Sequence, residues 1–516
     1  MLTPEFLDGL PDTLIKLYAQ AERDILMDMA RRIGAYDYWI PAAEHQKQML
    51  KEMGAAEEYI YQRLAELTGK STEELKTLFL LAANETLTSD GESYRAAGQE
   101  PETLDTSENL QKTLTAGMRQ TQNVFKNLTR TTARESTGVF VKVLDRAWMQ
   151  ISTETFDYNA AIRSAVKTLA EKGIQTANYD SGKSTSIEAA VRRAVLTGIN
   201  QTSLKMQDTL ADEMDSDLIE VTAHSGARPE HAKWQGKVYS RSGKSKKYPD
   251  FRKSTGYGTG AGLGGWNCRH NFFPFFEGSP RKYSEKQLKK LEEKDIEYNG
   301  QKMTKYEVSQ KQRYIERQIR RWKRENAAMQ AAGLDTYESA AKIKKWQDIQ
   351  KDFIKQTKLK RQYERERVPG FDYKAAKQVE RDIDAQKKIE KQKQERYNKK
   401  KEEAIQLIKS DTTSKSINRG HQNKHIKDSD GYIEGRSYIF GTLEDAQELV
   451  DRYHGTGEVK LTASIEWTHK EFVVADEPIG VWIDNTTGKE YETRRFSIHY
   501  GKKGTHIVPA KEVEEE

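Results

Sequence analysis

One long stretch, rich in Lys, Arg, Glu and Gln and nearly free of proline, most constrains how this chain can fold. Residues 281–410 hold 37 Lys and Arg against 22 Asp and Glu, and Pro369 is their single proline. So polar a stretch is typical of long, solvated helices. We expect a break at 368–370, because proline removes a helix hydrogen bond and clashes with the preceding turn. An apolar stripe runs along these helices and consists of Trp322, Ile343, Trp346, Ile349 and Phe353.

The parts of the chain on either side carry the opposite charge. Residues 1–280 hold 34 basic and 37 acidic residues, and residues 411–516 hold 14 and 20, whereas 281–410 has a net charge of +15. Clustered Lys and Arg are what phosphate binding requires, so DNA is a candidate partner of 281–410. A charged spacer with ion pairs along its helices is the equally weighted alternative.

Composition divides the 516 residues into parts of different character, and the length favours three or four domains. We expect a mainly helical domain at 1–221, a loop-rich Gly/His/Cys module at 222–280, a basic helical spacer at 281–410 and a small α+β domain at 411–516. The single cysteine, Cys268, excludes an intrachain disulfide, which fits a reducing cytoplasm. The sequence has no apolar run of about 18 residues and no signal-peptide pattern, so we expect neither a membrane span nor secretion.

Hydrophobic periodicity predicts helices over most of the first 170 residues. Apolar residues recur at helical spacing through 12–80, and Ser71 is expected to cap a new helix there. The pattern breaks into loops around 89–92 and 98–101 before helices resume. Residues 179–185 are similar to a phosphate-binding loop but have Ala177 where a glycine is required. We therefore interpret them as a turn before a capped helix that starts at Ile187.

Residues 222–270 contain the densest group of chemically versatile side chains. These are His224, His231, Cys268 and His270. Three imidazoles and a thiol can form a tetrahedral zinc site, although their spacing differs from that of paired-cysteine sites. The alternative is a loop-rich module held by histidine hydrogen bonds and tryptophan packing. A zinc hydrolase centred on Cys268 is disfavoured, because no acidic residue is placed beside these ligands as a general base.

Two motifs of this module also carry a resemblance. They are His224-Ser-Gly-Ala-Arg-Pro-Glu-His-Ala-Lys-Trp-Gln-Gly236 and Gly262-Leu-Gly-Gly-Trp-Asn-Cys-Arg-His270. Their order resembles that of the phage minor capsid protein 2 family and, more distantly, of the Mu-type head-morphogenesis proteins. The resemblance covers roughly residues 1–330. It implies a place inside a phage or prophage procapsid, with portal and capsid proteins as partners, and it implies no catalytic residues.

Residues 415–511 have the composition of a separate α+β unit. The pattern predicts a helix at 442–453 and an antiparallel meander, with strands near 457–467, 471–474, 479–484, 496–500 and 505–508. Alternation along the fourth strand places Ser497 and His499 on the face opposite Phe496 and Ile498. We therefore expect His499 on an open, polar face.

This unit is rich in histidine, with six of the ten in the chain. Imidazole gives and takes protons near neutral pH, so two of them beside a cation suit metal-free phosphodiester cleavage. One histidine would remove a proton from a ribose 2′-hydroxyl, a second would protonate the leaving 5′-oxygen, and a cation would stabilise the phosphorane, giving a 2′,3′-cyclic phosphate. The candidate catalytic residues are His425, His499, His506, Arg436, Ser437 and Lys502, with His421 as the alternative to His425.

The same unit carries a second resemblance, to the type-50 polymorphic toxin domain. The matching segments are Lys424-His-Ile426, Tyr432-Ile-Glu-Gly-Arg-Ser437, Gly455-Thr-Gly457 and Ser497-Ile-His-Tyr-Gly-Lys-Lys-Gly-Thr-His-Ile-Val-Pro509. The resemblance implies a barnase/EndoU/RelE-like fold and cleavage of RNA. A toxin of this kind also needs a cognate immunity protein.

Together these patterns indicate a phage or prophage minor capsid protein with a C-terminal, metal-independent ribonuclease domain. We expect it in the virion or procapsid interior, and in the host bacterial cytoplasm during assembly. The C-terminal domain should need no cofactor, whereas the 222–270 module is the candidate for a structural zinc. The alternative is a purely structural, portal-associated head protein whose C-terminal domain is a non-catalytic binding module.

Overall fold

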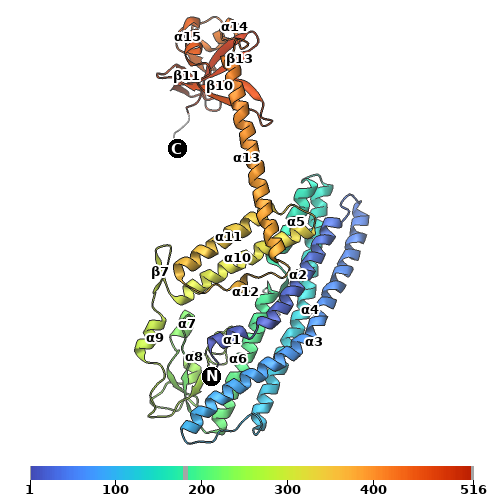
Figure 1. Ribbon diagram of the computed structural model, residues 1–516, viewed down its shortest axis with the longest axis vertical. Coiled ribbons are helices and arrows are strands. Elements are labelled where there is room, and N and C mark those ends of the chain that lie inside the picture. The colour runs from blue at the N-terminus through green and yellow to red at the C-terminus, as the bar shows by residue number, and fades with distance from the viewer. Residues whose placement is uncertain (1, 178–183, 513–516) are drawn as a thin grey trace. The chain divides into compact units, whose positions relative to one another are not determined.

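The chain forms two compact units, Met1–Ile383 and Asp384–Glu516, in a computed structural model that describes residues 2–177 and 184–512 (Figure 1). The first unit is mainly helical, and the second is small and rich in strands. The predicted class, a multidomain chain with a helical N-terminal part and a C-terminal α+β domain, is therefore confirmed at this level. The finer division into four domains stays a prediction. Among the described residues, no helix is long and apolar enough to cross a membrane.

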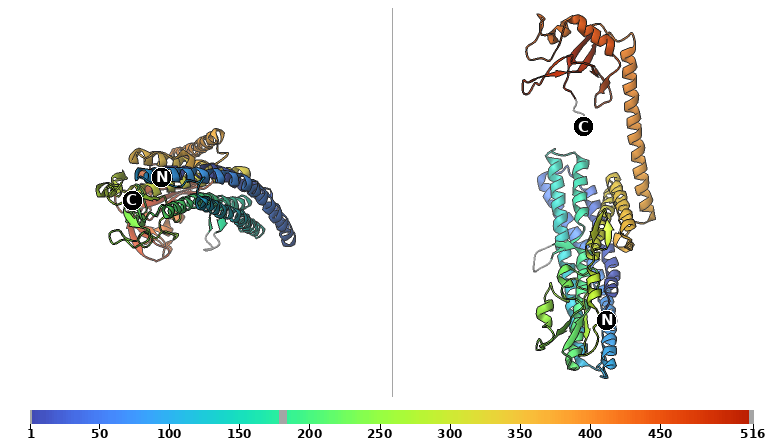
Figure 2. Two further views of the ribbon diagram at one scale, coloured as in Figure 1. Left: turned by 90° about the horizontal axis from the view of Figure 1, so that it is seen from below. Right: turned by 90° about the vertical axis from the view of Figure 1, so that its left-hand side faces the viewer.

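Long helices that pack side by side build most of the first unit (Figure 1, Figure 2). They are α2 (Asp12–Ala35), α3 (Ala42–Ala96), α4 (Glu108–Ser152) and α6 (Ile187–Glu213), with the shorter α1 (Pro4–Gly9) and α5 (Tyr158–Lys172). Where α4 crosses α6, Gly117 lies against Thr202 and Gly198 lies against Thr121. A Cβ atom on either glycine would overlap the threonine side chain, so the close approach of these helices requires glycine.

Helix α3 is continuous, so two boundaries predicted from the sequence are wrong. Ser71 does not cap a new helix but lies inside α3, where its hydroxyl donates to the carbonyl of Leu67. Residues 89–92 are helical too, and Asp90 is buried and accepts a hydrogen bond from Gln207 of α6. Packing against α6 thus outweighs the weak helix propensity of Ser, Asp and Gly. The loop expected around 98–101 is present.

A short hairpin and a capped helix follow α5. The hairpin pairs β1 (Gln175–Ala177) with β2 (Ser184–Ser186), and Ser186 caps α6 by accepting a hydrogen bond from the Ala189 N–H. The helix expected at Ile187 therefore starts where predicted. Most of the segment interpreted as a turn, residues 179–183, lies outside the described residues.

A three-stranded antiparallel sheet organises residues 218–274. Its strands are β3 (Leu218–Val221) in the centre, with β4 (Val238–Ser240) and β5 (Phe272–Pro274) on either side. Two loops leave this sheet, one containing α7 (Pro229–Ala232) and the other α8 (Phe251–Thr255). The glycine-rich run is loop, as expected. Within it Gly262 and Gly265 lie against the carbonyls of Gly256 and Gly260, where a Cβ atom has no room.

The predicted basic spacer is largely packed rather than solvated. Its elements are α9 (Glu285–Leu291), β6 (Ile296–Tyr298), β7 (Gln301–Met303), α10 (Lys305–Ala331), α11 (Tyr337–Thr357), α12 (Tyr363–Glu366) and α13 (Tyr373–Lys409). The apolar stripe explains the difference, because Trp322 of α10 and Ile343 and Phe353 of α11 are buried, and α10 also packs on α2 and α5. The helix break at 368–370 is confirmed. Helix α13 is mostly exposed, as expected of a solvated helix.

Two antiparallel sheets form the second unit. The larger has the order β14 (Gly504–Pro509), β13 (Arg495–Gly501), β10 (Trp467–Val474), β9 (Glu458–Leu461), and the smaller has β12 (Glu490–Thr493), β11 (Gly480–Ile483), β8 (Tyr438–Ile439). The predicted simple meander is therefore wrong, since the β11–β12 hairpin pairs with β8 instead of lying between β10 and β13. Helix α15 (Leu443–Tyr453) agrees with the helix predicted at 442–453, and Thr442 is its N-cap. Ala404 and Ile408 of α13 are buried in this core.

Candidate functional site

Four imidazole rings converge in the second unit. His499 of β13 and His506 of β14 are directly opposite in the antiparallel register, and their ring centroids are 4.7 Å apart. His421 of α14 (Arg419–Gln422) and His425 of the 3-10 helix η1 (Asn423–His425) bring their rings to 5.2 and 6.1 Å from that of His506. We call these four residues the His group. Because about 75 residues of sequence separate its two halves, only the fold brings them together.

Strand alternation and one buried glutamine hold the His group in place. Phe496 and Ile498 are fully buried in the core, which leaves Ser497 and His499 on the opposite face of β13, as the alternation predicted. On the other side of the group, the buried Gln422 side chain donates to the Ile507 carbonyl at 3.2 Å and accepts the Ile507 N–H at 2.7 Å. Gln422 thus fixes the α14–η1 segment to the edge of β14.

The environment keeps three of these rings neutral at neutral pH. Burial lowers the pKa of His499 to about 3 and that of His506 to about 4, and in both cases neighbouring histidines and Lys470 lower it further. Burial also lowers the pKa of His425, with Arg436 and Lys424 contributing. His425 donates its Nδ1–H to the Ser437 carbonyl at 2.7 Å, which leaves Nε2 with a free lone pair.

The other three candidates from the sequence, Arg436, Ser437 and Lys502, have different surroundings. Arg436 is exposed, and its charge acts on His425. The Ser437 hydroxyl holds β11, because its Oγ accepts the Ile483 N–H at 3.0 Å. Lys502 is exposed in the turn between β13 and β14. Lys502 is not among the cations that lower the pKa values of His425, His499 and His506.

Sequence reasoning missed three residues that support the His group. Lys470 is the cross-strand partner of His499, but the strand that contains it was predicted to start one residue later. Lys424 belongs to a segment that carries the toxin-domain resemblance, but the sequence pattern gave it no role. Ser497 lies with its Oγ 2.8 Å from Nε2 of His499, a contact that the two-residue spacing along one strand could have suggested.

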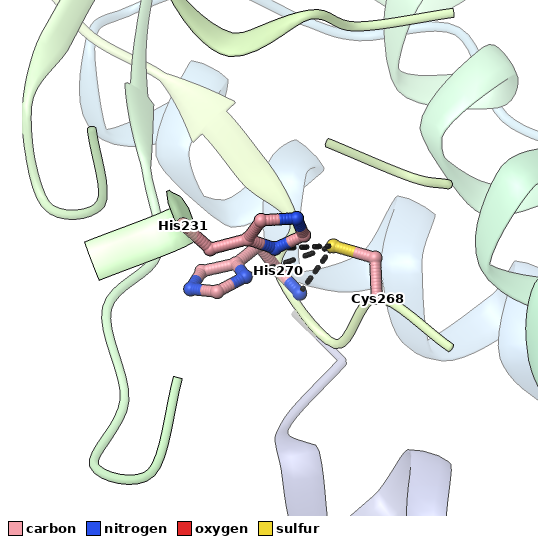
Figure 3. A group of neighbouring side chains, drawn as sticks. All are labelled: His231, Cys268 and His270. Carbon is pink, nitrogen blue, oxygen red and sulfur yellow. Dashed lines mark hydrogen bonds between the residues drawn. The ribbon is translucent and has the colours of Figure 1, made fainter. Parts of the chain in front are cut away.

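A second cluster lies in the loops beside the β3–β4–β5 sheet of the first unit (Figure 3). His231, Cys268 and His270 are buried, and their potential ligand atoms lie within 4.8 Å of one another. The Cys268 sulfur is 3.7 Å from Nδ1 of His231 and 3.6 Å from Nδ1 of His270. His224 lies close by, with its ring tilted against that of His270 and the two centroids 4.3 Å apart. The structure therefore brings together three of the four residues singled out as zinc ligands, and His224 lies beside this set but outside it.

Each imidazole of this cluster has its second nitrogen near a hydrogen-bond acceptor. His231 Nε2 lies 2.9 Å from the Ala261 carbonyl, and His270 Nε2 lies 3.1 Å from Oε1 of Gln235. His224 Nδ1 lies 3.2 Å from the Ser225 carbonyl. Such partners orient metal-binding histidines in proteins. Burial raises the pKa of the Cys268 thiol, which is the opposite of what a cysteine nucleophile requires.

Comparison with known proteins agrees with both resemblances. Residues 2–355 match the family described as Phage minor capsid protein 2, and residues 417–509 match that described as Bacterial toxin 50. The chain is 28% identical over 219 residues to "Structural protein" of Lactococcus phage LL-H, covering 41% of this chain and 56% of that protein. It is 35% identical over 128 residues to "Structural protein" of Lactococcus phage mv4, covering 24% of this chain and 95% of that protein.

The two family matches correspond to the two units of the structure. The first match spans the helical unit with the His/Cys cluster, and the second spans the sheets that carry the His group. The chain spans little more than half the length of the LL-H relative. The chain belongs to the phage minor capsid protein 2 family, and it carries a bacterial toxin domain at its C-terminal end.

Proposed function

We propose that this chain is a structural protein of a phage or prophage head whose second unit is a metal-independent endoribonuclease. The observation that carries the proposal is the convergence of His425, His499 and His506 beside Lys470 in a unit that matches a toxin family. Paired imidazoles next to a cation supply the acid, the base and the charge stabilisation that this cleavage requires.

His425 is the candidate general base. Its Nδ1–H is held by the Ser437 carbonyl, so Nε2 carries the lone pair, and its lowered pKa keeps that lone pair free at neutral pH. It takes the proton of a ribose 2′-hydroxyl, and the oxygen then attacks phosphorus. The bond from phosphorus to O5′ breaks, which leaves a 2′,3′-cyclic phosphate.

His506 is the candidate general acid that returns a proton to O5′. Its pKa of about 4 is low for this role in the unliganded domain. A phosphodiester between the rings brings a negative charge, and a nearby opposite charge raises the pKa of an imidazole. Lys470 stabilises the phosphorane, with Arg436 as a further cation at the His425 side. His499, held by Ser497, positions His506 across the hairpin.

The partners follow from the two units. Portal and capsid proteins are the proposed contacts of the first unit inside the virion, and α13 supplies lysines that packaged DNA can contact. An immunity protein is the proposed partner of the second unit while the particle is assembled in the host cytoplasm. The antiparallel sheet with α15 packed beside it supports the barnase/EndoU/RelE-like expectation.

The test uses a fragment that begins at Asp384, because this keeps Ala404 and Ile408 in the core. It is incubated with total RNA in EDTA, and the new ends are examined for cyclic phosphate. We expect cleavage by the wild type, and a loss of about 100-fold or more in His425→Ala and His506→Ala. His454→Ala is the matched control, since that ring is bound to the carbonyls of α15 and should not matter.

Intact RNA from a folded wild-type fragment would overturn the nuclease proposal. Equal loss in His454→Ala would show that the substitutions act through folding. The second candidate, a non-catalytic binding module, is favoured by the low pKa of His506, which disfavours an acid in the unliganded state. It predicts that the fragment leaves RNA intact and is harmless when expressed in bacteria.

A further inference from the structure

We propose that His231, Cys268 and His270, with His224 as the fourth ligand, bind a structural Zn²⁺ ion in the first unit (Figure 3). Zinc binds thiolate sulfur at about 2.3 Å and imidazole nitrogen at about 2.0–2.1 Å. In a tetrahedron of these bonds, sulfur and nitrogen lie roughly 3.5–3.6 Å apart. The distances from Cys268 Sγ to the two Nδ1 atoms are 3.7 and 3.6 Å, so these two sulfur–nitrogen spacings are already close to those of a zinc site.

The hydrogen-bond network leaves both Nδ1 atoms without a proton. His231 Nε2 lies against a carbonyl, which can only accept, so Nε2 must carry the hydrogen. Oε1 of Gln235 accepts the backbone N–H of His224 at 3.1 Å, which fixes the amide orientation. His270 Nε2 must therefore donate to that same oxygen, and its Nδ1 is bare as well.

A plain hydrogen-bonded cluster cannot satisfy these atoms. Two bare Nδ1 lone pairs face one sulfur, and a thiol has a single hydrogen to give. One buried nitrogen would stay unpaired, at a cost that proteins normally avoid. A metal ion accepts both lone pairs and the thiolate together, so it satisfies all three groups.

His224 adds an independent observation. Its Nδ1 lies against the Ser225 carbonyl, so the lone pair is on Nε2. That Nε2 is buried and has no hydrogen-bond partner among the described residues. His224 lies outside the set formed by His231, Cys268 and His270, so its side chain has to turn toward the ion to become the fourth donor. The ligands would then be three nitrogens and one sulfur, a set that suits zinc. A cavity of about 380 Å³ beside His224, Cys268 and His270 offers the ion a way in.

The ion would join two loops that have little regular structure. His224 and His231 lie in the loop after β3, and Cys268 and His270 lie after the glycine-rich run. Four ligands without an open position are typical of a structural site rather than a catalytic one. Gln235 also connects the two loops, because its Oε1 accepts hydrogen bonds from the backbone N–H of His224 and from Nε2 of His270. Binding would therefore stabilise the folded module directly.

The test uses the purified full-length chain. Zinc is measured by mass spectrometry after dialysis against buffer that contains a small excess of zinc and then against metal-free buffer. We expect about one Zn²⁺ per chain in the wild type. Cys268→Ser and His270→Asn should retain less than a tenth of this. His45→Gln is the matched control, because His45 is equally buried but is bound by Tyr36 and Asp145, and it should keep the metal.

A second measurement covers variants that fail to fold. The wild-type chain is stripped with chelator and titrated with Co²⁺, and a thiolate ligand produces a charge-transfer band in the near ultraviolet. A band that saturates at about one equivalent and disappears on addition of Zn²⁺ supports the site. Absence of the band in folded wild type, or full zinc content in folded Cys268→Ser, would overturn the proposal. Full content in His224→Ala alone would remove His224 from the ligand set and overturn the four-ligand form.

Discussion

Replacing Gln422 with alanine tests how the His group is assembled. The Gln422 side chain is fully buried and forms two hydrogen bonds with the backbone of Ile507, at 2.7 and 3.2 Å. Alanine leaves a buried N–H and a buried carbonyl without partners, at about 1–3 kcal/mol each, or about 2–6 kcal/mol together. Small domains are stable by about 5–15 kcal/mol, so the second unit loses a large share of its stability.

Gln447 provides a matched control in the same unit. It forms the same kind of pair, accepting the Ile417 N–H at 2.8 Å and donating to the Lys415 carbonyl at 3.1 Å. Gln447 is half-exposed, so water replaces it in the alanine variant, and the cost falls to about 1 kcal/mol per hydrogen bond or less. The difference between the two variants therefore measures burial rather than hydrogen-bond number.

Urea unfolding of the fragment from Asp384, followed by the fluorescence of Trp467 and Trp482, gives both free energies. The reasoning is refuted if the two variants lose the same stability, or if Gln422→Ala stays within about 1 kcal/mol of the wild type. Under conditions where Gln422→Ala remains folded, RNA cleavage should still fall, because the segment that carries His425 is no longer fixed to β14.

Three further predictions concern pH and packing. Burial, with His506, Lys470 and His425 nearby, lowers the pKa of His499 to about 3 in the folded unit, against about 6.5 in the unfolded chain. The unfolded chain therefore binds more protons below pH 6.5, and stability falls as the pH falls, by up to about 2 kcal/mol at pH 5; His499→Asn should flatten this slope in urea unfolding. Burial raises the pKa of Asp90 to about 7, so the free energy of unfolding falls as pH rises from about 4 to 7. Asn does not ionise, so the gain in Tm from Asp90→Asn should grow over that range, and a constant gain would contradict this reasoning. Gly117→Ala should lower the stability of the full chain by about 1–3 kcal/mol, because the new methyl group overlaps Thr202. Gly138→Ala on the same helix meets open space and should raise the stability by about 0.5–1 kcal/mol, and thermal unfolding measures both.

Local patterns were enough to predict several elements of the fold. The helix at 442–453, the start of α6 at Ile187 and the faces of β13 follow from short-range rules, and the structure has all three. Helix α3 was misjudged at Ser71 and at residues 89–92, because contacts with α6 decide there and are invisible in a local window. The same limit hid the packing of α10 and α11, because their apolar stripe was visible in the sequence but the elements that it packs against were not.

The candidate sites show a similar division. Histidine excess pointed to His499 and His506, and the short turn between their strands sets the register that places them directly opposite each other. The cations were harder to predict, because Lys470 comes from β10, a neighbour of β13 in space but not in sequence. The smaller sheet could not be foreseen either, since the pairing of β11 with β8 joins segments about 40 residues apart. Gln422 carried no local signal at all, as its role depends on the outer edge of β14, which is distant in sequence.

The low pKa values of His499 and His506 also bear on how the second unit would take up an anion. Rings that are neutral when the domain is empty gain a proton when a phosphate approaches, so ligand and proton bind together. Apparent affinity then weakens with rising pH even above the pKa of the free rings. The heat of binding depends on the buffer, because the buffer supplies the proton. The domain thus keeps these rings uncharged until an anion arrives, and the pH of the surroundings sets how readily it responds.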